Sequence, residues 1–199
     1  MLFDNVCLET IVQHLPEEIV TSEQLEKQLE PIYSRLKLNI GRLELFTGIR
    51  ERRFWAPGTS PSQAASEAGQ KALAQSGIDP DKIGCLIHSS VCRDFLEPAT
   101  ASVVHENLKL PQTTMIFDLS NACLGFINAT VMAGSLIENR TIPAALIVAG
   151  ENSRPLVETT VQALNLDTSI TRRSFKDSFA SLTFGSGAAA AVLTHSSIS

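Results

Sequence analysis

The 199-residue sequence has no apolar run long enough to cross a membrane, because its longest apolar stretches are strand-sized or interrupted by Gly and Asn. It also has no excess of positive charge. Its 16 Lys and Arg stand against 21 Asp and Glu, for a net charge of −5, which gives no reason to expect nucleic-acid binding. The first five residues, Met-Leu-Phe-Asp-Asn, contain no basic segment and no leader cleavage site, so we expect a cytoplasmic location.

The four cysteines lack the spacing of a metal site. There is no Cys-x-x-Cys pair and no Cys/His combination typical of zinc, so we predict no metal ion, and scattered cysteines are typical of reduced thiols. Internal repeats and low-complexity tracts are absent as well. What is present, 44% hydrophobic and 19% charged residues, is typical of a globular chain long enough for a sizeable core.

Apolar periodicity predicts alternating strands and helices. Strands are expected at 2–12, 82–90, 113–119, 143–150 and 188–194, and helices after Thr21 or Ser22, from Ser60 to near Gly77, from Pro98 to Leu108, and after Cys123. The run 143–150 is apolar throughout, as in a strand buried on both faces. This order predicts an α/β fold whose mainly parallel sheet is joined by right-handed crossovers.

Three segments are harder to interpret. Residues 36–46 show no clear pattern. Residues 47–55 carry several charges next to Phe54 and Trp55 and are interpreted as a solvated turn with aromatic anchors. The polar stretch at about 151–180 is long for a connection between two strands, which indicates a lid, an interface element or an ordered surface insertion.

The segment 118–126, Asp-Leu-Ser-Asn-Ala-Cys-Leu-Gly-Phe, joins a strand end, a tight turn and a helix start, with Cys123 at the junction. If Ser120 or Asn121 caps a helix that begins near Ala122, free N–H groups and the positive end of the helix dipole surround the Cys123 sulfur and favour a thiolate. A buried cysteine is often only a small hydrophobic residue, so the residues alone leave both interpretations open. The helix expected at 124–137 has no charge and must be covered on every face.

Four motifs, in chain order, resemble those of one family. Segment 118–126 is similar to the active-site motif of the ketoacyl-synthase III branch of the thiolase superfamily. Segments 47–53 and 184–193 are similar to its early Thr-Gly-Ile…Arg-Arg segment and its Gly-rich final strand. Segment 90–102, Ser-Val-Cys-Arg-Asp-Phe-Leu-Glu-Pro-Ala-Thr-Ala-Ser, resembles the OleA-type enzymes, which condense two fatty acyl thioesters head to head.

The resemblance implies that 1–199 is one N-terminal, thiolase-like βαβαβαββ half with a mixed, mainly parallel sheet. It also implies a Claisen-type condensation in which Cys123 holds one acyl group as a thioester and its backbone N–H belongs to the oxyanion site. Glu97 would be the base that reaches across a dimer interface. Without the resemblance, a glutamate before proline is most often a solvated charge at a helix start. Arg42 and Phe46 stand where the branch usually has a tryptophan and an arginine that hold coenzyme A.

The resemblance also implies the partners. The substrates would be acyl-CoA or acyl-ACP, with no further cofactor. The family's activating histidine, with an asparagine or second histidine, lies in a C-terminal half that is absent from this sequence; His88 and His105 match no family motif and are interpreted as structural. An uncovered half would expose an apolar patch. We therefore expect that a C-terminal-half chain or a homodimer mate covers it, or that the sequence is a fragment of a longer protein. Two alternatives remain. The chain could belong to a decarboxylative 3-oxoacyl-ACP synthase III, whose partner would be an acyl carrier protein, or it could be a catalytically incomplete supporting subunit.

Overall fold

A computed structural model describes residues 3–199, which form two compact units. The first comprises residues 3–14, 58–151 and 187–199, and the second comprises residues 15–57 and 152–186. The elements are β1 (Val6–His14), β2 (Glu18–Thr21), α1 (Ser22–Gln28), α2 (Glu30–Leu36), α3 (Arg42–Thr47), β3 (Glu51–Phe54), α4 (Pro61–Ser76), β4 (Ile83–His88), α5 (Thr100–Leu108), β5 (Met115–Asp118), α6 (Gly125–Glu138), β6 (Ala144–Glu151), α7 (Arg154–Leu166), α8 (Arg172–Asp177), α9 (Phe179–Thr183) and β7 (Gly187–His195), with 3-10 turns at Pro80–Lys82 and Ala122–Leu124. Each unit is therefore assembled from segments far apart in the sequence.

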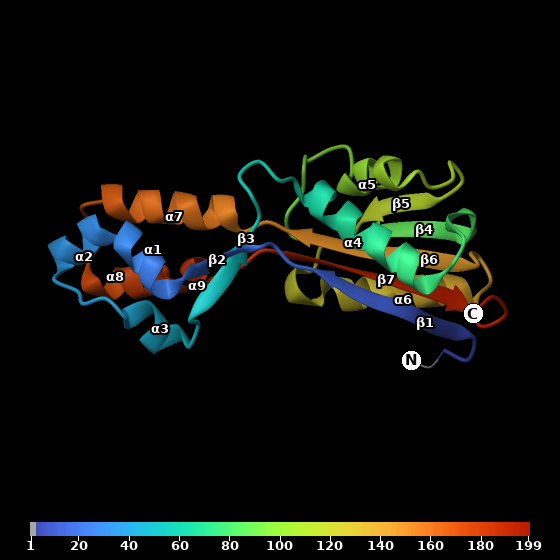
Figure 1. Ribbon diagram of the computed structural model, residues 1–199, viewed down its shortest axis with the longest axis horizontal. Helices are drawn as coiled ribbons and strands as arrows, with labels where there is room; N and C mark the ends of the chain where they lie inside the picture. The colour runs from blue at the N-terminus through green and yellow to red at the C-terminus, as the bar shows by residue number, and fades with distance from the viewer. Residues whose placement is uncertain (1–2) are drawn as a thin grey trace. The chain divides into compact units, whose positions relative to one another are not determined.

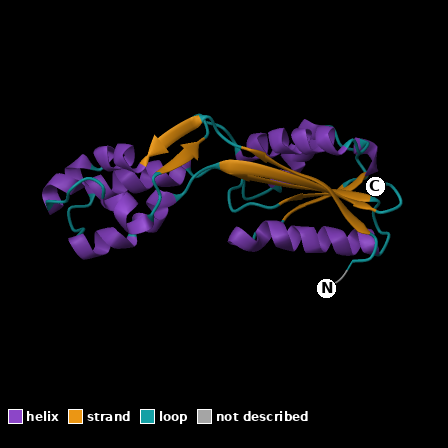
Figure 2. Ribbon diagram, turned by 60° about the horizontal axis from the view of Figure 1, so that its bottom comes forward, coloured by secondary structure: helices purple, strands orange, loops and turns teal. Residues whose placement is uncertain are grey.

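A five-stranded sheet forms the centre of the first unit, in the order β1-β7-β6-β4-β5. Strands β5, β4 and β6 are parallel, and β7 is antiparallel to both of its neighbours, β6 and β1. Four of the five strands therefore run in the same direction, which confirms the predicted mixed, mainly parallel sheet. Helices α4 and α5 cover one face, and α6 covers the other (Figures 1 and 2).

Helix α4 packs closely on β6 because both elements present small residues. Gly150 is the tightest point: a Cβ there would overlap the carbonyl oxygen of Pro61 and lie 2.9 Å from the nitrogen of Ala65. The helix itself begins and ends as predicted. Ser60 Oγ accepts a hydrogen bond from the N–H of Gln63 (3.1 Å), and Gly77 ends the helix with a φ of +68°.

The second unit joins the two-stranded antiparallel sheet of β2 and β3 to helices from both of its segments. Thr21 caps α1 in a reciprocal capping box with Gln24. The core draws equally on the two segments: Leu25, Leu29, Ile32, Tyr33, Leu43 and Phe54 pack with Val157, Val161, Leu164, Phe175, Phe179 and Leu182. Residues 152–186 thus share a core with residues 15–57, a pairing that local sequence patterns did not indicate.

The strands expected at 2–12 and 188–194 are observed as β1 (Val6–His14) and β7 (Gly187–His195), and residue 2 lies outside the described residues. The interpretation of 47–55 as a solvated turn is wrong. Glu51–Phe54 form β3, and Phe54 and Trp55 are buried. The buried Arg52 donates to the Val20 carbonyl and to Ser22 Oγ. Because β2 lies about thirty residues earlier, a local pattern could not show this pairing.

Candidate active site

Cys123 lies at the carboxyl edge of the sheet, after β5 ends at Asp118. The chain leaves the strand and passes through a single 3-10 turn, Ala122–Leu124, before α6 begins at Gly125. Ala122 has a φ of +43°, a left-handed conformation that is uncommon for residues other than glycine. The strained turn holds Cys123 at the surface, where its side chain is exposed.

The expected cap of this helix is wrong. The first helical turn begins at Ala122 as expected, as a 3-10 turn that runs directly into α6 at Gly125, but neither Ser120 nor Asn121 caps it; the Asn121 amide instead donates to Asn128 Oδ1 (2.6 Å). Within residues 3–199 no side chain caps the first turn of α6. The N–H groups of Leu124 and Gly125 instead donate to the carbonyls of Asn121 (2.9 Å) and Ala122 within the 3-10 turn.

Gly125 explains how close the turn comes to the neighbouring strand end. A Cβ at Gly125 would lie 2.8 Å from Ser89 Oγ and 3.7 Å from the Leu119 carbonyl. Ser89 directly follows β4, and its own N–H donates to the Val148 carbonyl of β6 (2.7 Å). Glycine at position 125 thus lets the start of α6 sit against the end of β4.

Asp118 connects the segment that carries Cys123 to α5. Its two carboxylate oxygens accept hydrogen bonds from the N–H groups of Thr100 and Ala101, each at 2.8 Å. The same carboxylate lies 3.5 Å from Nδ1 of His88, which has no exposed surface. Burial lowers the pKa of His88, while the Asp118 charge opposes that shift. A fully enclosed histidine agrees with the structural interpretation of His88, and His105, which contacts the nearby Pro111 carbonyl (2.9 Å), agrees as well.

Glu97 lies in the loop between β4 and α5, and its side chain is exposed. Helix α5 begins at Thr100, two residues later than the expected start at Pro98. Among the described residues Glu97 has no hydrogen-bond or ion-pair partner. Cys123 and Glu97 therefore follow the carboxyl ends of two adjacent parallel strands, the edge at which open α/β sheets bind ligands, but no contact joins them.

Sequence reasoning missed two residues that fix the Glu97 loop. Glu151 accepts hydrogen bonds from the N–H groups of Val91 (2.7 Å) and Cys92 (3.1 Å). Asp94 Oδ1 accepts from the N–H of Ser62 (2.9 Å) at the start of α4. A signal for Glu151 was present, because it is the first charged residue after the apolar run 143–150, where a parallel strand reaches the carboxyl edge of the sheet.

Comparison with known proteins shows which proteins this chain resembles. The family model of 3-oxoacyl-[acyl-carrier-protein] synthase III matches residues 117–199, which include Cys123 and α6. Acyl-CoA:acyl-CoA alkyltransferases from Shewanella oneidensis and Xanthomonas campestris are 37% and 38% identical to this sequence over 198 residues, which is 100% of the chain. The chain thus resembles the N-terminal half of these alkyltransferases, and its residues 117–199 match the 3-oxoacyl-ACP synthase III family model.

Solved structures of this family give the same fold. A crystal structure of Xanthomonas campestris OleA matches with a TM-score of 0.93 and 38% identity, covering 99% of this chain and 60% of that chain. This match confirms the predicted thiolase-like fold. A beta-ketoacyl-[acyl-carrier-protein] synthase III from Helicobacter hepaticus is a more distant relative, with 29% identity over 187 residues.

The chain spans 56% and 58% of the length of the two alkyltransferases, and the match falls on the N-terminal half of these family members. Among residues 3–199, no helix is long and apolar enough to cross a membrane. The same residues contain no group of three or more His, Cys, Asp or Glu side chains that could hold a metal ion. Arg42 and Phe46 lie on α3, and the Lys176 ammonium is 4.9 Å from the centre of the Phe46 ring.

Helix α6, which follows the turn that carries Cys123, is covered on one side only. Its small residues Ala129 and Ala133 pack with Ile137 against the sheet. The other side exposes apolar side chains: Leu124, Ile127, Val131 and Met132. We expected this helix to be covered on every face. Among the described residues, only the side that faces the sheet is covered.

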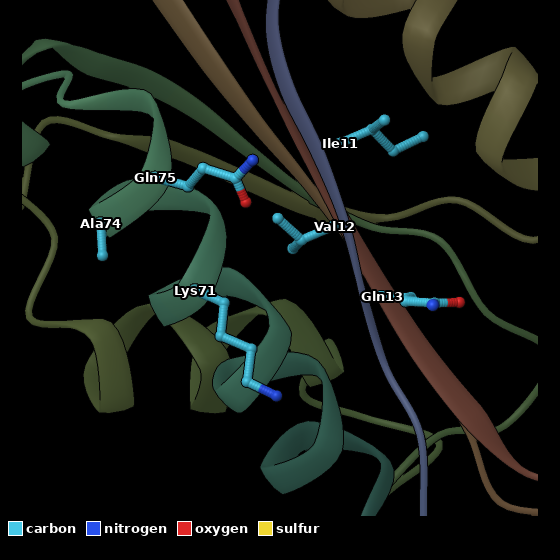
Figure 3. A pocket seen from close by; sticks show the side chains of 6 residues that line it. All are labelled: Ile11, Val12, Gln13, Lys71, Ala74 and Gln75. Atoms are coloured by element: carbon cyan, nitrogen blue, oxygen red, sulfur yellow. The ribbon is translucent and has the colours of Figure 1, made fainter.

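A groove of about 560 Å3 between β1 and α4 is separate from the family's active-site motif. Val12 points toward α4 and Ile11 toward the opposite side of β1, as Figure 3 shows. Lys71, which lines the groove, lies 2.6 Å from Nδ1 of His14, whose Nε2 lies 2.5 Å from Glu67. Since neither Cys123 nor Glu97 lines this groove, it is not part of the candidate site.

Proposed function

We propose that this chain is the nucleophile-bearing part of an acyltransferase that joins two fatty acyl thioesters in a Claisen-type condensation. The observation that carries the proposal is the exposed position of Cys123 on a strained turn, directly before the uncapped start of α6. In the first step the Cys123 sulfur attacks the thioester carbonyl, a new C–S bond forms, and the carrier thiol leaves with a proton. The N–H of Cys123 donates to the carbonyl oxygen as it gains negative charge.

Glu97 is proposed as the base of the second step. Its carboxylate removes an α-proton from the second acyl thioester, and the resulting carbanion attacks the carbonyl carbon of acyl-Cys123. The C–S bond to Cys123 then breaks, which returns the thiolate and releases a 3-oxoacyl thioester. A non-catalytic role for Glu97, in which its charge only stabilises the start of a helix, has less support. Asp118 already binds the first N–H groups of α5.

The solved OleA structures support both assignments. They include a cysteine-to-serine variant with lauric acid and lauroyl-CoA bound, and variants in which one glutamate is replaced. That glutamate and that cysteine are 26 positions apart. Glu97 and Cys123 are separated by the same 26 positions.

The same structures support the need for a second half. The histidine replaced in other OleA variants lies 142 positions after the cysteine, so its counterpart would fall beyond residue 199. We propose that a C-terminal half, on a longer polypeptide or another chain, supplies this histidine and covers the exposed side of α6, and that a homodimer mate receives Glu97. Acyl-CoA or acyl-ACP would be the substrate, in the cytoplasm.

A decarboxylative 3-oxoacyl-ACP synthase III is the second candidate, since relatives with that activity are 29% to 34% identical. Such an enzyme forms its carbanion by loss of CO2 from malonyl-ACP and needs no base at Glu97. A supporting subunit, the third candidate, would never carry an acyl group. The three candidates therefore differ in the role of Glu97 and in the labelling of Cys123.

The test is intact mass spectrometry of the chain, alone and together with its second half, after incubation with a long-chain acyl thioester. We expect Cys123 to gain the acyl mass, Cys123→Ser to remain unlabelled, and Glu97→Gln to keep the acyl group while condensation falls by at least about 100-fold. Unchanged condensation in Glu97→Gln would favour the decarboxylative enzyme. No label under either condition would leave only the supporting subunit.

A further inference from the structure

The loop between β4 and α5 carries Glu97 near its exposed tip. Phe95 and Leu96, directly before it, are 50% and 86% exposed, so the tip is not fixed by its own packing. A catalytic base must nevertheless be held close to its productive geometry. The groups that fix the ends of the loop therefore decide where Glu97 can act.

Two carboxylates bind the opposite ends of this loop. At its beginning, Glu151 accepts hydrogen bonds from the N–H groups of Val91 (2.7 Å) and Cys92 (3.1 Å). At its end, Asp118 accepts from the N–H groups of Thr100 and Ala101, both at 2.8 Å. Each carboxylate thus holds two successive backbone N–H groups, and residues 93–99 span the distance between them.

The two carboxylates are held by the sheet. Glu151 is the last residue of β6 and pairs with Gly187 of β7, and Asp118 is the last residue of β5 and pairs with His88 of β4. Strands β6 and β5 flank β4, from which the loop starts. Because charged acceptors form stronger hydrogen bonds than neutral ones, this arrangement couples the loop to three neighbouring strands.

Asp94 adds a brace within the loop. Its side chain accepts from the N–H of Ser62 (2.9 Å) in α4, and its own N–H donates to Thr100 Oγ1 (3.2 Å). Ser90 also contributes, since its Oγ accepts from the N–H of Gly150 (2.8 Å). Residues 95–97 are thus the part of the loop that projects from fixed points on both sides.

We propose that Glu151 and Asp118 are positioning residues, whose carboxylates clamp the loop so that Glu97 is held for proton removal in the condensation step. This inference rests on the proposed function, in which Glu97 is the base. Asp118 belongs to the same segment as Cys123, so its substitution would disturb acylation too. Glu151 is the last residue of a different strand, β6. Substituting Glu151 can therefore distinguish an effect on condensation from an effect on acylation.

The test is Glu151→Gln in the complete enzyme, meaning this chain together with its second half. Glutamine keeps the size of the side chain, but its amide nitrogen cannot accept a hydrogen bond, so one of the two N–H partners is lost. We expect acylation of Cys123 to stay within about twofold, while condensation falls about tenfold or more. The matched control is Glu106→Gln, an exposed glutamate of α5 that pairs with Lys109, and it should leave both rates unchanged.

Two further measurements separate positioning from a general structural effect. The double variant Glu97→Gln/Glu151→Gln should condense no more slowly than Glu97→Gln alone, because Glu151 acts through Glu97. The N–H groups of Val91 and Cys92 should exchange hydrogen faster in Glu151→Gln, while α6 exchanges at its usual rate.

Normal condensation in Glu151→Gln, an equal loss of acylation and condensation, or additive losses in the double variant would each overturn the positioning role. The proposed function fails separately, if Glu97→Gln condenses at the native rate. If Glu97→Gln is impaired and Glu151→Gln is not, only the positioning role is overturned.

Discussion

Substituting Gly150 by Ala should strongly destabilise the first unit. The new methyl group would overlap the carbonyl oxygen of Pro61 and lie 2.9 Å from the nitrogen of Ala65. Both are backbone atoms of α4, so no side-chain rotation can relieve the overlap, and the helix must shift away from β6 by about an ångström in a closely packed core. We expect a loss of about 3 kcal/mol, the upper end of the usual cost of overpacking, out of a total stability of about 5–15 kcal/mol.

Urea unfolding followed by far-UV circular dichroism measures this loss as a fall in the midpoint of about 1.5 M, for a slope of about 2 kcal/mol per M. Gly69→Ala is the matched control. Its methyl group would meet the flexible Leu108 side chain at 2.9 Å, and alanine gains up to about 1 kcal/mol over glycine inside a helix, so the net change should stay within about 1 kcal/mol. The reasoning is refuted if Gly150→Ala unfolds within about 1 kcal/mol of the native chain or if both variants lose the same amount.

Two further predictions concern titratable side chains. Burial lowers the pKa of His88 below its ordinary 6.5. The unfolded chain therefore binds the proton more readily, and the stability should fall as the pH drops below about 6.5. In His88→Asn the urea midpoint should fall less between pH 7 and 5 than in the native chain, and an equal fall would contradict this reasoning. Burial also raises the pKa of the Cys85 thiol to about 11, whereas Cys123 is exposed. At pH 8 iodoacetamide should therefore modify Cys123 and spare Cys85 until the chain is unfolded in urea, which peptide mass spectrometry would detect.

The parts of the fold that local chemistry determines were predictable. Ser60, Pro61 and Gly77 fix both ends of α4 through interactions within a few residues, and the apolar run of β6 reports a strand covered on both faces. The turn that carries Cys123 was predictable for the same reason, because a β-favouring run, polar turn residues and small residues follow one another within a single short segment.

The parts that depend on distant segments were not predictable. Phe54 indicated only a local anchor, because the strand and helices that bury it come from other parts of the chain. The cap of this helix was misjudged because Asn121 bonds Asn128 instead of the helix N-terminus. Glu151 binds N–H groups about sixty residues earlier, a pairing that only the strand order brings about.

The divided core of the second unit has a consequence for synthesis on the ribosome. Its first six core side chains end at Phe54 and the next begins at Val157, so the early group emerges about one hundred residues before its partners. At roughly 5–20 residues per second this takes about 5–20 s. During that interval Leu25, Leu29 and Ile32 are exposed to solvent and to other nascent chains, while the β4–α5–β5–α6 segment can already begin to fold. The first unit is completed later still, because β7 emerges after the last segment of the second unit and β1 must wait for it to pair.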